Sequence, residues 1–301
     1  MLKGLRLVTV TSLALAIVTM AAGAAGAAET QRQQVGTCAG TLTAPGVLAG
    51  TYHGDVVVIG ACAVNGGAAV IKGDLILAPH SVLNATFALN DVAKTGTSSL
   101  TVHGDIKVGT GATLAMGCEP NFSPCSDDPN AGTGGTLTGQ NKVSGSVRAS
   151  GALGVLLHAS KIHGDVSMIG GGGGLTCAVP TTGFFSVLGS PVFSDAEDNT
   201  IGGGLSIAGL QTCWMGALRN QVGASIFTGF NTMADPDANE VLANVVRGNI
   251  ACVGNTPAAQ YGDSASSPNK VRGTAFGECA FNVRQPNPAP SGPPTPISVK
   301  I

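Results

Sequence analysis

A short alternation of apolar and polar residues returns along this chain. Its pattern is an apolar residue, a variable residue, Gly, a polar residue and a second apolar residue, as in Val102–Ile106. Further copies begin at Tyr52, Ile71, Val143, Ile162, Ile201, Val246 and Val271, and a degenerate copy with Ala in the Gly position begins at Val222. Period-two alternation predicts a β-strand. A strand that recurs in this way predicts a solenoid, in which each turn buries its apolar face against its neighbours.

The spacing of these copies predicts the size of one turn. His53 and Lys72 are 19 residues apart, and Arg247 and Arg272 are 25 apart. Turns of about 20 residues suit three short strands joined by tight turns, so we expect an all-β, single-stranded parallel β-helix. The crossover rule predicts right-handed winding. Two intervals of 41 and 39 residues each contain either an extra rung or a long insertion.

Both ends of the chain differ from its centre. Lys3 and Arg6 precede an apolar run and a series of alanines, which predicts a signal peptide over residues 1–28. A retained membrane anchor is the alternative, but the apolar run is short for a membrane span. We expect the solenoid over residues 29–282 and a Pro-rich flexible tail over 283–301. The mature protein is therefore expected to be secreted and extracellular, with no membrane segment after signal cleavage.

Charge and cysteine content narrow the function further. The formal net charge is −2, and loss of Lys3 and Arg6 makes it about −4, which argues against a nucleic-acid partner. Eight cysteines in an exported chain predict four disulfides, and 105 pairings are open. Neighbouring rungs favour Cys38–Cys62, Cys118–Cys125, Cys177–Cys213 and Cys252–Cys279. We expect no metal, because CxxC and HxxxH pairs and a calcium-loop spacing are absent from the sequence.

Two further features of the sequence have structural interpretations. Residues 117–135 predict a polar loop closed by Cys118 and Cys125, and excursions are also expected after Gly170 and over 230–239. An Asn stands two positions before the first apolar residue of several copies. Stacked rungs would let these amides bond along a column, and the members are Asn141, Asn199, Asn220, Asn244 and Asn269.

The repeat also predicts columns of outward side chains. If Val102 and Ile106 point inward, Gly104 does too, while His103 and Asp105 face outward. Stacking then forms a basic-leaning column of His53, Lys72, His103, Ser144, His163, Arg247 and Arg272, beside an acidic column of Asp55, Asp74, Asp105 and Asp165. These charges either keep the sheet soluble and in register or form a binding or catalytic face. Trp214 either stacks on a sugar ring or packs on a disulfide. His80 and His158 receive no role.

The phrases Asn244–Pro257 and Asn269–Gly273 resemble exported repeat proteins of actinomycetes, and the early His-Gly-Asp and Lys-Gly-Asp copies resemble the β-solenoid of bactofilin-type proteins. Secreted polysaccharide lyases are similar in architecture. Because nothing in the sequence demands a reaction, we expect a non-catalytic extracellular scaffold or a protein that binds a cell surface or a carbohydrate such as an acidic polysaccharide, with self-association left open. The alternative is a lyase that cleaves a uronate polymer such as hyaluronan. His103 and His163 would then be the bases, Asp105 and Asp165 would orient them, and Lys72, Arg247 or Arg272 would hold the polymer. We expect no cofactor.

Overall fold

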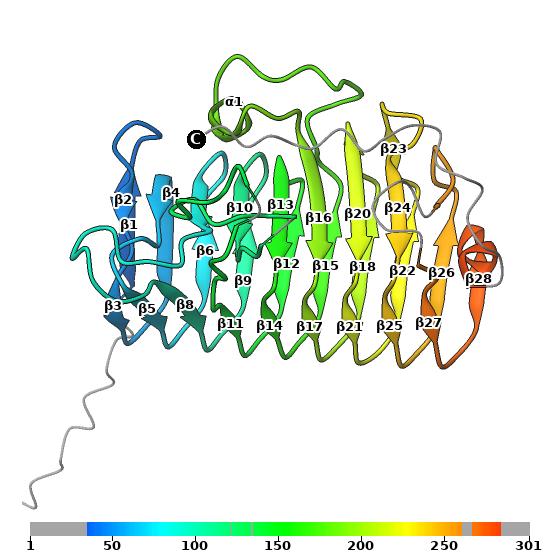
Figure 1. Cartoon of the computed structure of the whole chain (residues 1–301), viewed down its shortest axis with the longest axis horizontal. Coiled ribbons are helices and arrows are strands. Elements are labelled where there is room, and N and C mark those ends of the chain that lie inside the picture. Colours follow the sequence, from blue (N-terminus) through cyan, green and yellow to red (C-terminus); the bar gives the residue numbers. More distant parts are fainter. Residues whose placement is uncertain (1–34, 121, 134, 261–266, 284–301) are drawn as a thin grey trace, which may run out of the picture. The chain divides into compact units, whose positions relative to one another are not determined.

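Successive turns of the chain stack their strands in parallel, as Figure 1 shows. The computed structural model describes residues 35–120, 122–133, 135–260 and 267–283, all within the unit Gln33–Ile301. The predicted signal peptide lies outside these residues, and so does the predicted tail after residue 283. The strand pairings between named strands are parallel throughout the described part of the chain. The expected all-β parallel solenoid is therefore confirmed, whereas its handedness stays a prediction.

The strands fall into three rows, which we call sheets 1, 2 and 3. Sheet 1 follows the Gly of each repeat copy. Its strands are β1 (Gly36–Gly40), β4 (Val56–Ala63), β6 (Leu75–Leu77), β9 (Ile106–Val108), β12 (Val147–Ser150), β15 (Val166–Ile169), β18 (Leu205–Ala208), β22 (Ile226–Gly229), β26 (Ile250–Val253) and β28 (Ala275–Gly277).

Sheet 2 follows sheet 1 along each turn. Strand β4 continues through the corner from sheet 1 into sheet 2, so its first residues pair with β6 and its last residues pair with β7. The other strands of sheet 2 are β2 (Gly46–Val47), β7 (Val82–Ala85), β10 (Thr113–Met116), β13 (Gly154–His158), β16 (Phe193–Glu197), β20 (Trp214–Leu218) and β24 (Asn239–Leu242).

Sheet 3 completes each turn and ends at the first apolar residue of the repeat copy. Its strands are β3 (Gly50–Tyr52), β5 (Ala68–Ile71), β8 (Ser99–Val102), β11 (Lys142–Val143), β14 (Lys161–Ile162), β17 (Thr200–Ile201), β21 (Gln221–Val222), β25 (Val245–Val246) and β27 (Lys270–Val271). A small pair, β19 (Gln211–Thr212) and β23 (Thr232–Met233), lies outside the three rows.

Helices are short. The helix α1 (Phe184–Leu188) belongs to an excursion between β15 and β16, and the 3₁₀ helix η1 (Glu278–Val283) follows β28. Within the described residues, no helix has the length and apolar character needed to cross a membrane.

The register settles how the long intervals are built. Val102 pairs directly with Val143, and Ile162 pairs directly with Ile201, so each long interval is an insertion between neighbouring rungs and contains no extra rung. The separations between paired residues are 19, 31, 41 and 39 in the first part of the solenoid and 21 to 25 later on. A spacing of about 20 residues therefore describes only some of the turns.

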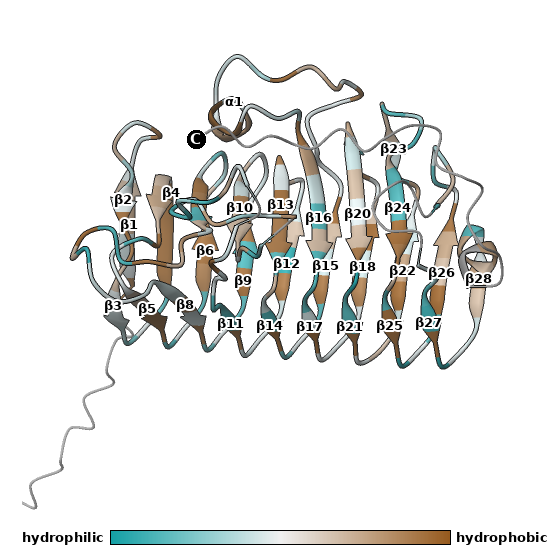
Figure 2. Ribbon diagram, in the orientation of Figure 1, coloured by the Kyte–Doolittle hydropathy of each residue, from teal (hydrophilic) through white to brown (hydrophobic). Residues whose placement is uncertain are grey.

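Inward aliphatic side chains from all three sheets form one continuous core. Val102, Ile106 and Leu114 are completely buried in it. The two-residue strands of sheet 3 place one residue outward and one apolar residue toward the core, and the outward residue is polar in every one of them except β25, where it is Val245. Figure 2 shows the outward polar residues of β21 and β27 in teal. Burying these side chains, at about 25 cal/mol per Å² of apolar surface, is what makes the stacked turns stable.

The Gly of the repeat does not have the predicted position. Strand β8 ends at Val102 and β9 begins at Ile106, so Gly104 lies at a corner between sheets 3 and 1, not inside an extended strand. A Cβ at Gly104 would meet the backbone of the preceding rung, with the carbonyl oxygen of Gly73 only 2.6 Å away. The prediction of an inward Gly that fits a narrow core is therefore wrong. Gly is required because the backbones of stacked corners approach closely.

All four predicted disulfides are confirmed. They join Cys38 to Cys62, Cys118 to Cys125, Cys177 to Cys213, and Cys252 to Cys279. The second bridge closes the expected loop after Gly117, and the third ties the excursion that carries α1 to the start of β20. Four disulfides are typical of a protein that folds in an oxidising compartment.

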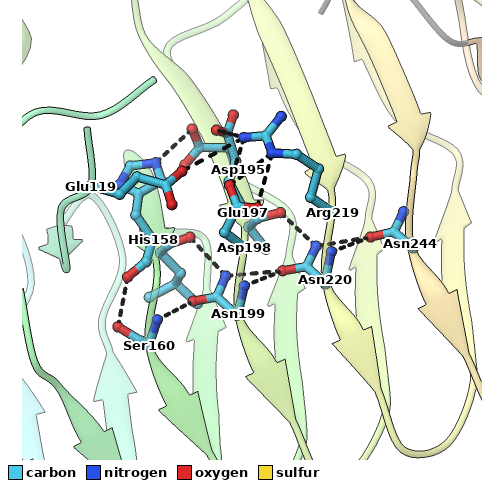
Figure 3. Close-up of polar contacts among 12 residues, drawn as sticks. Glu119, His158, Ser160, Asp195, Glu197, Asp198, Asn199, Arg219, Asn220 and Asn244 are labelled. Atoms are coloured by element: carbon cyan, nitrogen blue, oxygen red, sulfur yellow. Dashed lines mark hydrogen bonds and ion pairs between the residues drawn. The ribbon is translucent and has the colours of Figure 1, made fainter. Parts of the chain in front are cut away.

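The predicted Asn column is confirmed for four of its five members. Asn199, Asn220, Asn244 and Asn269 stack at the corner after sheet 2, and successive side-chain amides bond at 2.9 to 3.0 Å. Figure 3 shows the first three of these residues. Asn141 occupies the same corner, but Ser160 takes the Asn position in the rung between it and Asn199. A second column at the corner between sheets 1 and 2, made of Asn231, Asn255 and Glu278, was not predicted.

Candidate functional site

The predicted basic-leaning column lies at the corner between sheets 3 and 1. Each backbone N–H in it bonds to the preceding rung, as when His103 N–H donates to Ile71 and Arg272 N–H donates to Val246. Members with long side chains are exposed. The structure therefore places four residues of the predicted ligand set on one column, with His53 and Lys72 in neighbouring rungs at its N-terminal end and Arg247 and Arg272 in neighbouring rungs at its C-terminal end.

Sheet 3 adds three exposed lysines immediately before this corner. Lys142 and Lys161 are direct partners on β11 and β14, and Lys270 lies on β27. We call the combined exposed surface the basic strip, and its members are His53, Lys72, His103, Lys142, Lys161, His163, Arg247, Lys270 and Arg272. No carboxylate occupies either of its two rows. Opposite charges therefore do not alternate within the strip, and the aspartates Asp55, Asp74, Asp105 and Asp165 lie beside its N-terminal half only.

The two ends of the basic strip differ. Near its C-terminal end a shallow depression is lined by Val245, Arg247, Lys270 and Arg272. Among the described residues, none of these three cations forms an ion pair. At the N-terminal end, the Lys72 Nζ atom lies 3.1 Å from Nε2 of His103. The C-terminal end therefore presents the cations that are most available to an anion.

The predicted acidic column has a backbone role that the sequence did not reveal. The Asp55 carboxylate accepts the backbone N–H of Asp74 at 2.8 Å, and Asp74 accepts that of Asp105 at 2.8 Å. Asp105 and Asp165 likewise accept the N–H groups of Ser146 and Gly204 in the following rungs. The side chain after each Gly thus satisfies the N–H of the next corner, and Ser146, Ser225 and Asn249 do the same where Asp is absent.

The second carboxylate oxygen of two of these aspartates binds a cation of sheet 1. Asp74 Oδ2 lies 2.6 Å from Lys107 Nζ, and Asp105 Oδ2 pairs with Arg148. The hydrogen bond from Lys107 holds the pKa of Asp74 below its usual value. Within the described residues, neither His103 nor His163 is hydrogen-bonded to the Asp that was expected to orient it. The two histidines are exposed, and their role as bases stays a prediction.

Trp214 is not near the basic strip. It lies on β20 in sheet 2, where its ring meets Phe193 edge to face with centroids 5.7 Å apart, and its Nε1–H donates to Glu240 at 3.2 Å. Phe193 in turn contacts Phe185 of α1. The excursion that carries α1 therefore covers the outer face of sheet 2, and Trp214 is part of that cover. The structure separates Trp214 from the other four predicted ligand-binding residues.

Beside this cover is a polar cluster that sequence analysis missed. We call it the acid–imidazole cluster, and it consists of Glu119, His158, Asp195, Glu197, Asp198 and Arg219 (Figure 3). His158 ends β13, Asp195 and Glu197 alternate on β16, and the register places Glu197 beside His158. The alternate positions Val155 and Leu157 belong to the core, so the charged side chains lie on the outer face of sheet 2. The loop closed by Cys118 and Cys125 contributes Glu119.

Contacts within the cluster are close. His158 Nε2 lies 3.0 Å from Asp195 Oδ2, and both residues are almost completely buried. Arg219 donates through Nη2 to Glu197 at 2.9 Å and through Nε to both oxygens of Asp198 at 2.8 and 3.0 Å. The guanidinium also lies over the ring of Phe122, 3.9 Å from its centroid. One guanidinium and one imidazole thus face four carboxyl groups.

Burial and like charge displace the pKa values of these groups. Burial raises the pKa of Glu119 to about 8, with the Asp198 carboxylate adding to the effect. Burial and the neighbouring Asp195 charge raise the pKa of Glu197 to about 7. Burial disfavours the charged form of His158, but the charge and hydrogen bond of Asp195 outweigh it and raise its pKa to about 9. Such displaced values, produced by desolvation and specific partners, are typical of functional sites and also of buried structural networks.

No protein-family model, curated protein or solved structure gives a significant match to this chain. The likeness to actinomycete repeat proteins, bactofilins and polysaccharide lyases therefore stays a prediction.

Proposed function

We propose that this chain is a secreted scaffold protein whose basic strip binds an acidic polysaccharide at a cell surface. The observation that carries the proposal is the two-row basic strip without a carboxylate, in a protein whose formal net charge is negative. Segregated cations focus a positive potential and attract an anionic chain. Right-handed winding, as the crossover rule predicts, and export through the N-terminal signal belong to the same proposal.

The stacking of the rungs suits a polymer ligand. Parallel strands lie about 4.8 Å apart, so cations in successive rungs lie at that spacing in the two segments of the strip on either side of the uncharged rungs of Gly202 and Gly223. Arg247 and Arg272 occupy neighbouring rungs and can each bind a carboxylate in bidentate fashion. A chain of uronate sugars laid along the strip would meet these guanidinium groups in succession. A short ligand would contact only one or two of them and would bind weakly.

The test is a binding titration with hyaluronan and polygalacturonate, with neutral dextran as the control polymer. We expect the protein to bind the two acidic polymers only. Affinity should fall as the salt concentration rises from 50 to 300 mM, because added ions screen the attraction between exposed charges and the Debye length is already only about 10 Å at 0.1 M. The variant Arg247→Gln/Arg272→Gln should bind about tenfold more weakly. Arg148→Gln is the matched control, because Arg148 is exposed on sheet 1 outside the strip. Equal affinity of the double variant and the parent would refute the assignment.

A second candidate function, a lyase acting on a uronate polymer, is favoured by one contact. Lys72 and His103 meet at 3.1 Å and would supply a cation for the uronate carboxylate and a base for the adjacent carbon-bound proton. The ultraviolet absorbance of the unsaturated product tests this on a panel of acidic polysaccharides. Absence of any rise in absorbance would remove the lyase and leave the scaffold. A rise that persists in His103→Ala/His163→Ala would place the reaction elsewhere.

A further inference from the structure

The acid–imidazole cluster has the composition of a cation site. Three of its side chains, His158, Asp195 and Glu197, can each direct one ligand atom so that the three atoms lie within 4.8 Å of one another. A tetrahedral ion bound at about 2.0 to 2.2 Å holds its ligand atoms about 3.4 Å apart, so rotations of these side chains would bring their ligand atoms to that spacing. The three residues come from neighbouring strands of a parallel sheet, which fixes their backbones.

Unused ligand atoms point to a ligand independently of the acidic character of the cluster. His158 is 4% exposed and Asp195 is 2% exposed, and yet Nδ1 of His158 and Oδ1 of Asp195 have no hydrogen-bond partner among the described residues. Buried polar atoms in native proteins are nearly always paired. Arg219 occupies only Oε2 of Glu197, so this residue also has a second oxygen to offer. Asp195 Oδ1 and the second oxygen of Glu197 are thus available to an ion, and the imidazole would bind it through Nε2, the nitrogen that faces Asp195.

Charge balance favours the same conclusion. Four carboxyl groups share this buried region with one guanidinium and one imidazole, and the guanidinium is committed to Asp198 and Glu197. A buried negative charge is costly unless a cation or a proton compensates it. One imidazole with carboxylates suits borderline divalent ions such as Zn²⁺ and Mn²⁺, whereas Ca²⁺ prefers oxygen ligands alone.

We propose that His158, Asp195 and Glu197 bind one divalent metal ion of the Zn²⁺ and Mn²⁺ class. Glu119 and Asp198, with side chains 14% and 26% exposed, lie at the solvent side of the cluster and mark the route by which an ion reaches it. The ion would join β13 to β16 beneath the loop that Cys118 and Cys125 close. This site is separate from the basic strip and does not depend on the proposed polysaccharide binding.

The experiment uses the oxidised full chain, freed of metal with a chelator and then titrated calorimetrically with ZnCl₂, MnCl₂ and CaCl₂. We expect one equivalent of Zn²⁺ or Mn²⁺ to bind with micromolar or tighter affinity, and Ca²⁺ to bind at least tenfold more weakly. At one hundred times the dissociation constant, the ion should raise the melting temperature by about 5 °C. Absence of Zn²⁺ and Mn²⁺ binding up to millimolar concentration would mean that the cluster is a buried ion-pair network only.

Two sets of variants locate the ion. Glu197→Gln, which keeps the shape of the side chain, should weaken binding at least tenfold. The triple variant His53→Gln/His103→Gln/His163→Gln removes the exposed histidines of the basic strip and should bind as the parent does. In that triple variant, pulsed electron paramagnetic resonance of bound Mn²⁺ should still detect a coordinated imidazole nitrogen, a readout that stands even if Glu197→Gln does not fold. Loss of binding in the triple variant would assign the metal to surface histidines and overturn the proposal.

Discussion

Asn220 offers the sharpest test of how the stacked corners are stabilised. It is completely buried, and its side chain links three consecutive rungs. Its Oδ1 accepts the backbone N–H of Asn199 at 3.1 Å and the Asn199 side-chain amide at 3.0 Å, and its Nδ2 donates to Ala196 at 2.7 Å and to Asn244 at 3.0 Å. Asn220→Ala removes all four bonds. The N–H of Asn199 then has no other partner among the described residues.

The expected magnitude follows from those losses. A buried N–H without a partner costs about 1 to 3 kcal/mol, and each further lost hydrogen bond about 0.5 to 1.5 kcal/mol. Because Asn199 and Asn244 retain other contacts, we expect Asn220→Ala to lower the free energy of unfolding by about 3 to 5 kcal/mol. The melting temperature should fall by about 10 °C.

Urea unfolding of the oxidised chain measures this difference, provided that the slope with denaturant is unchanged. Gln221→Ala is the matched control, because Gln221 is the next residue and its side chain is exposed. It should change the free energy of unfolding by less than about 0.5 kcal/mol. Amide hydrogen exchange gives a local readout, since the N–H of Asn199 should lose protection in Asn220→Ala first. Equal stability of the two variants would refute the role of the Asn column.

Three other outcomes follow from the structure. Lys107 lowers the pKa of Asp74 in the folded state, so this pair stabilises the protein at pH values above the unfolded pKa of about 3.9. The difference in unfolding free energy between the parent and Asp74→Asn should therefore shrink as the pH falls from 5 to 2. Gly104→Val should destabilise the protein by clash with the Gly73 backbone, and melting like the parent would show that the corners can separate. Titration of free thiols should find none in the folded protein, and reduction should remove about 2 to 4 kcal/mol for each bridge in the chain-entropy description.

Features that depend on repetition could be predicted from the sequence. The recurring phrase fixed which residues stack, so the parallel sheets, the exposed column through His103 and the Asn column through Asn220 could all be inferred. Neighbouring rungs also limited the choice among cysteine pairings, which is why Cys38–Cys62 and the other three were found. The failure at Gly104 has a physical cause. A five-residue phrase with alternating apolar residues looks like a single strand. In the structure a corner lies within the phrase, so its side chains do not alternate between two faces of one strand.

The acid–imidazole cluster could not be assembled in the same way. Its residues are separated by up to 100 positions, and the two insertions that cover the outer face of sheet 2 have no repeat that would give their register. One signal was nevertheless present. Charged residues at Asp195 and Glu197 alternate with Ser194 and Ala196, so the charges share one face of a strand in a chain with only 11% charged residues. Alternate acids on one strand indicate an outward polar face, but not that an insertion will bury it.

The backbone at this corner is left-handed in four successive rungs. The residue before the corner position has φ of 44° at Ala159, 54° at both Asp198 and Arg219, and 55° at Ala243. A non-glycine residue in this region costs about 1 kcal/mol or more relative to glycine, and the corner could use glycine throughout. Two rungs have charged residues there, and those residues pair with each other. The left-handed corner directs both side chains onto the outer face of sheet 2, so the conformational cost and the buried charges occur at the same place. Ala159 and Ala243 adopt the same conformation without a charge, so the left-handed residue belongs to the corner itself, and the rungs of Asp198 and Arg219 use it to place an ion pair beside the unpaired Oδ1 of Asp195.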